Sequence, residues 1–327
     1  FRVVDEAATE TATTRHLLTH MGGWTGDYFQ STGEGADALD RMLEEMSGLQ
    51  QLVPINTVYS YNNSGFYVAG KMIEQLTGQS YEEVFDAVIV DELGLPDTYI
   101  RPRDIITRRF AVGHSVSDTG TRTARPYSLN RAAWAAGGAI MTVGDMLTYA
   151  AFHMGDGRNN SGERVISASA LRSMQSRQAP KLGSPRSIGI TWHLEDVGPV
   201  LTVSHGGATV GQIAQLTLVP EHDFAVAVVS NANTGRRAVP AITARALDLY
   251  LDVKAEEREA LSLATAEMEL YVGLYSRPFA DVFVTLDDGQ LKVREVVKQG
   301  FPDKDSPPPE PGPPIAVEFF DLSLIHI

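Results

Sequence analysis

Three short segments of the chain hold side chains that could do acid–base or nucleophilic chemistry. They are His16-Leu17-Leu18-Thr19-His20, Tyr59-Ser60-Tyr61-Asn62-Asn63-Ser64-Gly65 and Ser204-His205-Gly206-Gly207-Ala208. Two histidines four residues apart share one face of a helix and could bind zinc, but the helical zinc motif has Glu after its first histidine, where this chain has Leu17. The simpler interpretation is a helix that ends in a histidine hydrogen-bonded to a following loop.

The second and third segments offer a hydroxyl, an amide and a strand that a ligand can approach. Tyr61 and Asn63 stand just before an expected helix, where Asn is also a common cap, so capping and packing are the simpler interpretation of that pair alone. Gly206 and Gly207 precede an apolar hairpin, and two adjacent glycines let a reacting group come close to a strand. A turn is the default interpretation of this segment.

Helical periodicity, caps and glycine stops predict the helices that position these segments. Ser80 and Glu83 form a capping box, while Gly78 and Gly94 supply helix stops. Residues 135–139 indicate a glycine-rich turn. Helices are expected over 66–76, 84–93, 142–153 and 240–251.

Strand signals dominate the rest of the chain. Segments 213–219 and 224–229 are nearly continuously apolar and flank a turn, so they predict an antiparallel hairpin in a mostly buried sheet that also contains 200–203. From about residue 262 the pattern changes to alternating strands around Asp288-Gly289, a hairpin turn. The predicted domains are therefore 1–261 and 262–327, and the second contains a proline-rich loop over 302–314.

Composition excludes several classes of protein. The formal net charge is -14, from 41 acidic and 27 basic side chains, so the field repels nucleic acid. The absence of cysteine excludes a thiolate nucleophile, a disulfide framework and Cys-ligated zinc. The longest stretch without charged residues, 197–220, contains Ser204, His205 and Gln212 and predicts no membrane span. Cellular compartment and oligomeric state stay open.

The ordered set of motifs along the chain resembles the serine β-lactamase and penicillin-binding-protein-like superfamily, nearest to class C β-lactamase-like hydrolases, family VIII esterases and D-aminopeptidases. The resemblance covers about 14–233 and rests on Thr14–Gly23, Tyr61-Asn62-Asn63 with Gly65, Leu93-Gly94-Leu95-Pro96, Gly137-Gly138 with Asp145, His205-Gly206-Gly207-Ala208 with Gly211 and Pro220, and Ser230-Asn231. It implies an α+β fold of the β-lactamase/transpeptidase type. That fold is an antiparallel sheet flanked by helices plus a helical subdomain, here followed by part of a small β-rich C-terminal domain similar to the β-barrel modules of D-aminopeptidase-like members.

The resemblance also implies roles for residues. Tyr61 would be the proton-shuttling tyrosine, Asn63 the amide that orients substrate and the catalytic lysine, and His205 with Gly207 the third motif. The backbone N–H of Ala208, with that of the nucleophilic serine, would form the oxyanion hole. A tyrosine with an unperturbed pKa of about 10 can act as a base only if cationic neighbours favour its phenolate. The reaction would be acyl transfer to water from a small ester, amide or D-amino-acid peptide, with no cofactor and no metal.

One departure from the family is serious, because the chain contains no Ser-x-x-Lys. Its lysines are Lys71, Lys181, Lys254, Lys292, Lys298 and Lys304, and none follows a serine by three residues. We therefore expect an N-terminally truncated, inactive chain whose full-length protein is a serine hydrolase. A non-catalytic binding or sensor protein on the same fold is the first alternative, and a metal hydrolase centred on His16 and His20 is the second.

The third motif also predicts a substrate preference. Gly206 has no hydroxyl, and His205 is mostly neutral near pH 7, so the site would hold a substrate carboxylate poorly. Neutral short-chain esters or substrates with a free amino terminus are expected to be preferred over penicillins and cephalosporins. Asn-x-Ser at Asn62 and Asn159 is taken as a chance match to the glycosylation motif.

Overall fold

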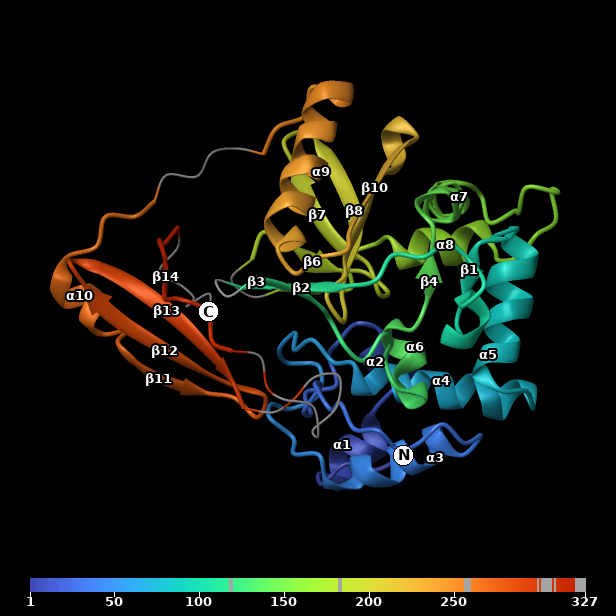
Figure 1. Cartoon of the computed structure of the whole chain (residues 1–327), viewed down its shortest axis with the longest axis horizontal. Coiled ribbons are helices and arrows are strands. Elements are labelled where there is room, and N and C mark those ends of the chain that lie inside the picture. The colour runs from blue at the N-terminus through green and yellow to red at the C-terminus, as the bar shows by residue number, and fades with distance from the viewer. Residues whose placement is uncertain are drawn as a thin grey trace. The chain divides into compact units, whose positions relative to one another are not determined.

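The computed structural model describes residues 1–117, 120–181, 184–255, 260–298, 300, 308 and 310–320. The chain separates into two compact units: Phe1–Lys181 with Pro185–Ala255 forms the first, and the second includes the chain from Glu256 onward. Figure 1 labels the elements of both units. The sequence puts the boundary at residue 262, and that position stays a prediction.

An antiparallel sheet is the centre of the first unit. Its strands, in spatial order, are β10 (Phe224–Ser230), β9 (Ile213–Val219), β8 (Val200–Ala208), β7 (His193–Val197), β6 (Ser187–Ile188) and β5 (Ala179–Pro180). The predicted hairpin is confirmed, because Val219 pairs with Phe224 across the short turn between β9 and β10. Strand β8 runs five residues beyond the predicted end at 203 and so carries the third motif within it.

Helices cover both faces of this sheet. Helix α7 (Val143–Met154) packs through Met146 and Ala150 on the face that bears Leu216 and Leu218. Helix α9 (Gly235–Leu251) packs on the other face, because alternate residues of a strand point to opposite sides. Both helices are confirmed, although α9 begins five residues before the predicted start and contains Pro240.

A helical subdomain completes the first unit. Its elements are α1 (Glu6–Thr11), α2 (Thr14–Leu18), α3 (Ala38–Glu45), α4 (Ser64–Thr77), α5 (Tyr81–Val84) and α6 (Trp134–Gly137), with short 3₁₀ turns at Met46–Gly48, Pro102–Ile105 and Arg131–Ala133. Helix α8 (Ala168–Met174) precedes the sheet, and a further 3₁₀ turn, Pro220–His222, joins β9 to β10. Its core is built around the fully buried side chains of Trp24, Met42 and Tyr67. Gly78 ends α4 in a left-handed conformation with φ of 68°, as predicted.

Of two local predictions in this subdomain, the helix over 84–93 is confirmed but differs in type, and the turn over 135–139 is wrong. The helix expected over 84–93 follows its capping box as α5 but continues as a π-helical segment, Phe85–Asp91. Val88, Ile89 and Val90 are consecutive β-branched residues, whose side chains crowd an α-helix. The turn expected over 135–139 is instead occupied in part by α6, which is held by the buried Trp134.

Two small ladders and the second unit account for the remaining strands. In the first unit β1 (Thr98–Tyr99) pairs with β4 (Ile140–Met141), and β2 (His114–Ser117) pairs with β3 (Gly120–Thr123). The second unit contains α10 (Thr265–Glu269) and a sheet in the order β11 (Gly273–Ser276), β12 (Ala280–Asp287), β13 (Gln290–Val297) and β14 (Ile315–Ala316). The predicted Asp288-Gly289 turn joins β12 to β13, with φ of 51° and 75°. Most of the predicted loop over 302–314 lies outside the described residues.

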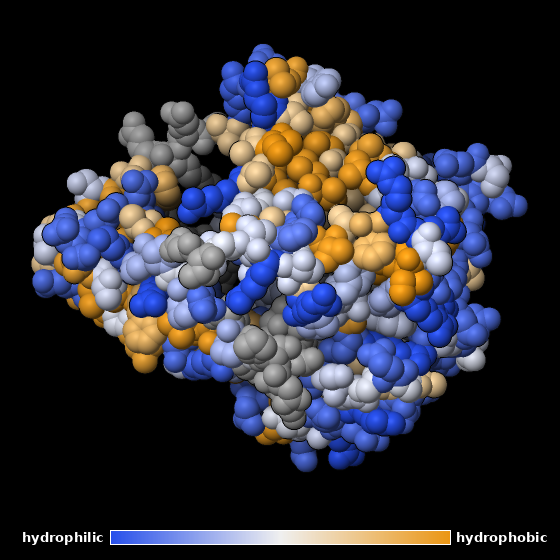
Figure 2. All heavy atoms as spheres, viewed as in Figure 1, coloured by the Kyte–Doolittle hydropathy of each residue, from blue (hydrophilic) through white to orange (hydrophobic). Residues whose placement is uncertain are grey.

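The surface around β10 and α9 is apolar. Figure 2 shows hydrophobic side chains gathered over these two elements, where Val229, Ile242 and Leu249 are 50%, 51% and 61% exposed. Strand β10 is one edge of the sheet, and within the described part of the chain no further strand pairs with its outer side. Among the described helices, none combines the length and the apolar character needed to cross a bilayer.

Candidate active site

The end of α2 brings the first two motifs together. The helix stops at Leu18, and His20 lies beyond it with a left-handed backbone, φ 58°, and only 1% of its side chain exposed. Its Nδ1 accepts a hydrogen bond from the backbone N–H of Asn62 at 2.9 Å, and its carbonyl accepts from Ser60 N at 3.0 Å. The expected loop-bound histidine is therefore confirmed, and the loop that it binds is the Tyr61 segment.

Asn62 rather than Asn63 caps the following helix. The Oδ1 of Asn62 accepts from Gly65 N at 2.7 Å and from Ser64 Oγ at 2.8 Å, while its Nδ2 donates to the carbonyl of Trp24 at 3.0 Å. Asn63 occupies the N-cap position of α4 without a capping bond from its side chain. The prediction that Asn63 is a cap is therefore wrong, because the buried Asn62 already satisfies the helix start.

Asn63 instead turns to a carboxylate. Its Nδ2 donates to Asp27 Oδ1 at 3.0 Å. Burial, and then this same carboxylate, raise the pKa of Tyr61 above its ordinary value. The residues around Tyr61 thus disfavour its phenolate, and the cationic neighbour that a tyrosine base needs has to come from another group.

The third motif lies on an unpaired stretch of strand edge. Strand β7 pairs with β8 only from Val200 to Ser204, whereas β9 pairs with β8 as far as Ala208. Thr209 N donates to the carbonyl of Gln212 at 3.0 Å, toward the β9 side. Because N–H directions alternate along an antiparallel strand, the N–H groups of Gly206 and Ala208 point to the opposite, open edge.

Aromatic side chains link the motifs. The ring of Tyr61 stacks on His20 at 4.3 Å between centroids and lies 6.4 Å from His205. His205 stacks on His193 at 5.2 Å, and Tyr59 closes the circle, 6.3 Å from His193 and 5.6 Å from His20. We call these five side chains the aromatic circle. The structure thus brings Tyr61 and His205 together, as the resemblance implies.

Sequence reasoning missed several neighbours of this circle. Lys181 places its ammonium 4.6 Å from the centre of the Tyr59 ring. His193 is opposite Ser204 in the β7–β8 register and so stands beside His205. The register could not be read from the sequence, and Lys181 follows a two-residue strand that carries no pattern of its own. In the sequence, the only sign of this aromatic cluster was the close spacing of Tyr59 and Tyr61.

The histidines of the circle are neutral near pH 7. Burial first, and then neighbouring charges that include His205 and Lys181, lower the pKa of His20 and the pKa of His193 to about 3 each. Burial also lowers the pKa of His205, with Lys181 acting in the same direction. The pKa of Lys181 is itself lowered by burial and by Arg186. The expectation that His205 supplies no positive charge agrees with this direction.

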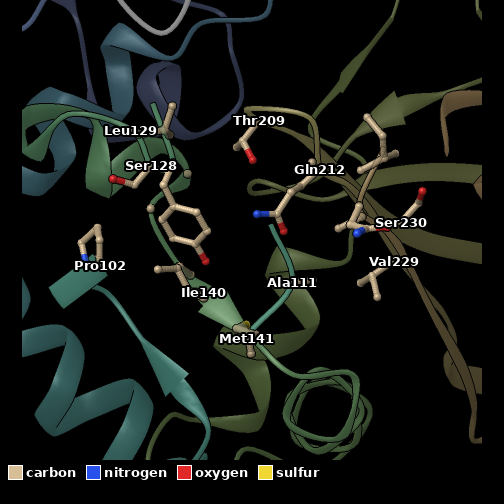
Figure 3. A pocket seen from close by; sticks show the side chains of 18 of the residues that line it. Pro102, Ala111, Ser128, Leu129, Ile140, Met141, Thr209, Gln212, Val229 and Ser230 are labelled. Carbon is tan, nitrogen blue, oxygen red and sulfur yellow. The ribbon is translucent and has the colours of Figure 1, made fainter. Parts of the chain in front are cut away.

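Two cavities lie beside these residues on the α7 side of the sheet. Tyr61 and His205 both line one of about 420 Å³, whose other walls are mostly apolar and aromatic and include Phe66, Trp134 and Trp192. A second, of about 280 Å³, is lined by Gly207 and by both apolar and polar side chains, among them Thr209 and Gln212. Figure 3 shows the second cavity, with Thr209 and Gln212 on one wall and Ser128, Leu129 and Ile140 on the other.

The two histidines of the first motif have different partners. His16 Nδ1 accepts from Thr13 N at 3.2 Å within the capping box of α2, whereas His20 Nδ1 binds the Asn62 backbone. Over the described residues, no three His, Asp or Glu side chains lie close enough together to hold a metal ion. His16 lies in an exposed capping box and His20 is buried against the Tyr61 segment, so the two side chains serve different local contacts and the geometry gives that alternative no support.

Comparison with known proteins places this site in a family. The Beta-lactamase family matches residues 3–250, which is most of the chain. The chain therefore belongs to the beta-lactamase family, whose fold it has.

Its relatives include penicillin-binding proteins and hydrolases. It is 31% identical over 247 residues to penicillin-binding protein 4 of Amycolatopsis lactamdurans, covering 71% of this chain and 62% of that protein. It is 21% identical over 331 residues to an unguisins hydrolase of Aspergillus violaceofuscus, covering 93% of this chain and 55% of that protein. The chain thus spans less than two thirds of the length of either relative.

Solved structures share the fold at low sequence identity. SurE superposes with a TM-score of 0.68 at 22% identity, covering 91% of this chain and 70% of that one. An octameric penicillin-binding protein homologue from Pyrococcus abyssi gives 0.59 at 21% identity, covering 88% and 67%. A D-amino acid amidase from Ochrobactrum anthropi gives 0.57 at 20% identity, covering 69% and 67%. The sheet flanked by helices, expected from the motifs, is therefore confirmed as a β-lactamase fold.

Proposed function

We propose that the whole protein is a serine hydrolase that acts through an acyl-enzyme on ester, amide or D-amino-acid peptide bonds. One observation carries the proposal: Tyr61 and His205 face one cavity, beside the open edge of β8 that presents the N–H of Ala208. The wall of the cavity thus has a proton-transferring hydroxyl, and strand β8, which brings His205 to the cavity, presents the backbone donor of Ala208 three residues further along. Those are the two groups that acyl transfer to a serine requires.

The proposed reaction has two steps. With Tyr61 as its phenolate, the hydroxyl oxygen of a serine bonds to the substrate carbonyl carbon and its proton passes to the Tyr61 oxygen. The carbonyl oxygen becomes an oxyanion, which the N–H groups of Ala208 and of the serine stabilise. The bond to the leaving group then breaks, and that group takes the proton. Water attacks the resulting ester by the same route and releases the acid. A lysine beside Tyr61 would offset the burial and the Asp27 charge that raise its pKa.

The serine and its lysine are proposed to come from a part of the protein outside these residues. The sequence contains no Ser-x-x-Lys. Among the described residues, no lysine lines either cavity, and the serines of the second cavity, Ser128 and Ser230, are followed three residues later by Arg131 and Asn233. The cavity between Tyr61 and His205 is where the missing pair would fit.

Mass spectrometry of the whole protein tests this proposal. Brief treatment with an activated p-nitrophenyl ester should add one acyl group on a serine outside these 327 residues, and the 327-residue chain should gain none. An adduct on the 327-residue chain would show that the nucleophile is misplaced. Reversible ligand binding by the whole protein, without any adduct or turnover, would overturn the hydrolase and favour a binding or sensor protein.

Substrate preference is the finer part of the proposal. Neutral His205 and the absence of a hydroxyl at Gly206 disfavour a substrate carboxylate, although the Lys181 ammonium stands two rings from His205. The chain is also 33% identical over 88 residues to the teichoic acid D-alanine hydrolase of Staphylococcus aureus, whose name fits a D-alanyl substrate. We propose that the whole protein prefers neutral esters or D-aminoacyl substrates to β-lactams.

A direct comparison of three substrates decides the matter. We expect kcat/KM of the whole protein to be higher for p-nitrophenyl acetate and for a D-alanyl p-nitroanilide than for nitrocefin, by about tenfold or more. Lys181→Met should lower the nitrocefin rate more than the ester rate if this ammonium assists anions. If nitrocefin proves the best substrate, the inference that Gly206 disfavours a substrate carboxylate is wrong.

A further inference from the structure

The backbone of His20 has an unusual, left-handed conformation. Its φ of 58° is one that residues with a side chain rarely adopt, and such backbone outliers persist in buried sites where surrounding contacts fix them. Here the surrounding contacts are two hydrogen bonds from the Tyr61 segment, Ser60 N to the His20 carbonyl and Asn62 N to its Nδ1. Backbone and side chain of one histidine therefore hold both neighbours of Tyr61.

The hydrogen bond from Asn62 also fixes the tautomer of the imidazole. Because Nδ1 accepts, the neutral ring carries its proton on Nε2. That Nε2–H is buried and has no hydrogen-bond partner among the described residues. A buried donor without a partner destabilises the fold, so its retention points to a role that an apolar side chain could not fill.

The faces of the imidazole are packed by aromatic rings. Tyr61 stacks on it at 4.3 Å with an interplanar angle of 27°, Phe66 lies at 5.4 Å, and Tyr59 meets it edge-on at 5.6 Å. The Tyr61 ring is thus supported by the His20 ring while its backbone is held through Asn62. Stacking and the hydrogen bond act on the same residue from two directions.

We propose that His20 is a positioning residue for Tyr61, which it holds facing His205 through its ring face and its Nδ1. This inference rests on the proposed function for its consequence in catalysis, but the geometry that it asserts does not. His20 acts through Tyr61 and not on the substrate. Removing its ring and acceptor therefore matters for turnover only while Tyr61 has a hydroxyl to position.

The test in the whole protein is a double-mutant cycle of His20→Asn with Tyr61→Phe. Asn tolerates a positive φ and keeps an acceptor near Nδ1 but removes the stacked ring, whereas His20→Gln keeps a distal N–H and loses the Nδ1 acceptor. We expect His20→Asn to lower kcat by about tenfold with KM within about twofold, and to change kcat by less than about twofold when Tyr61 is already Phe. An equal loss in both backgrounds would show a structural role independent of Tyr61 and overturn the proposal.

A second readout needs no activity. In the whole protein with isotope-labelled tyrosine, the ring resonance of Tyr61, assigned by its loss in Tyr61→Phe, should move in His20→Asn because the imidazole ring current is removed. His153→Asn is the matched control, since His153 is also buried, with a pKa lowered to about 4 and an Nδ1 without a partner, but its ring contacts are with Tyr149, Phe152 and Trp192. That variant should leave the Tyr61 resonance in place.

The two readouts separate the two claims. If the whole protein has no hydrolytic activity but the Tyr61 resonance moves in His20→Asn alone, the proposed function fails and the positioning stands. If activity is present and the resonance stays unmoved, the positioning fails and the proposed function stands. Should His20→Asn fail to fold, His20→Gln is measured in the same two ways, with the same resonance shift and the same non-additivity expected.

Discussion

The two walls of the candidate site are built in different ways. The Tyr61 segment is fixed by buried side chains, with His20, Asn62 and Ser64 exchanging hydrogen bonds with backbone and with one another. The facing wall, from His205 to Ala208, is held by backbone pairing with β9 and presents exposed glycines and backbone N–H groups. The difference teaches that the first wall is sensitive to side-chain changes and the second to backbone changes.

The largest effect is expected on the backbone wall. Ala208→Pro removes the outward N–H, and kcat/KM of the whole protein should fall about 1000-fold, the upper range for the loss of one oxyanion donor. Proline is tolerated where a strand N–H faces an open edge, so folding should survive, as circular dichroism would show. Ala208→Ser keeps the N–H and should stay within about twofold. A fully active Ala208→Pro would contradict the oxyanion assignment.

The second largest effect is expected at Tyr61, on the wall that buried side chains fix. Tyr61→Phe should lower kcat by about 100-fold with little change in KM, because proton transfer matters chiefly in the transition state. Tyr59→Phe removes a hydroxyl from the same aromatic circle and keeps its ring over Lys181, so its loss should be below about tenfold. Steady-state kinetics on one ester measure both. If the two variants behave alike, Tyr61 is not the proton carrier.

Two adjacent asparagines divide function from stability. Asn63→Ala should reduce kcat/KM by about tenfold, acting on both constants, because its amide orients groups already present in the ground state. Asn62→Ala should lower the free energy of unfolding by about 2 to 3 kcal/mol, since it removes the hydrogen bonds that Asn62 makes to Gly65 N and to the Trp24 carbonyl. Urea unfolding and kinetics on both variants check the division. The reverse pattern would show that the cap and the substrate amide are exchanged.

The smallest effect is a dependence of stability on pH. Burial lowers the pKa of His20 and of His193 to about 3, below the ordinary value near 6.5 that they regain when unfolded. The unfolded chain then binds more protons between these values, so stability is full above pH of about 6.5 and is lost progressively as the pH falls toward 3. Urea midpoints across that window measure it, and His20→Asn should flatten the dependence. A midpoint that rises on acidification would contradict the burial of these rings.

The sequence anticipated elements whose signals are local. Helix α4 with its Gly78 stop, helix α7 and the Asp288-Gly289 hairpin all follow from periodicity and from the conformational preferences of individual residues. The π-helical form of segment 85–91 and helix α6 were not predicted. Crowding among β-branched residues favours the first, and packing around Trp134 favours the second. The same holds for the candidate site: its motifs could be recognised in the sequence, but the residues that contact them could not.

By itself, the sequence determined the family, the alternation of helix and strand, and the motifs at Tyr61 and His205, since each is written in residues that are neighbours along the chain. Only the tertiary structure decided that His20 holds the Tyr61 segment, that Asn62 caps α4, that His193 stacks on His205 and that Lys181 lies over Tyr59. Most of those contacts join residues far apart in sequence, and the cap joins near neighbours whose choice between Asn62 and Asn63 burial decides. They depend on strand register, on where a helix ends and on which polar atoms burial leaves in need of a partner, and no local pattern of residues encodes these.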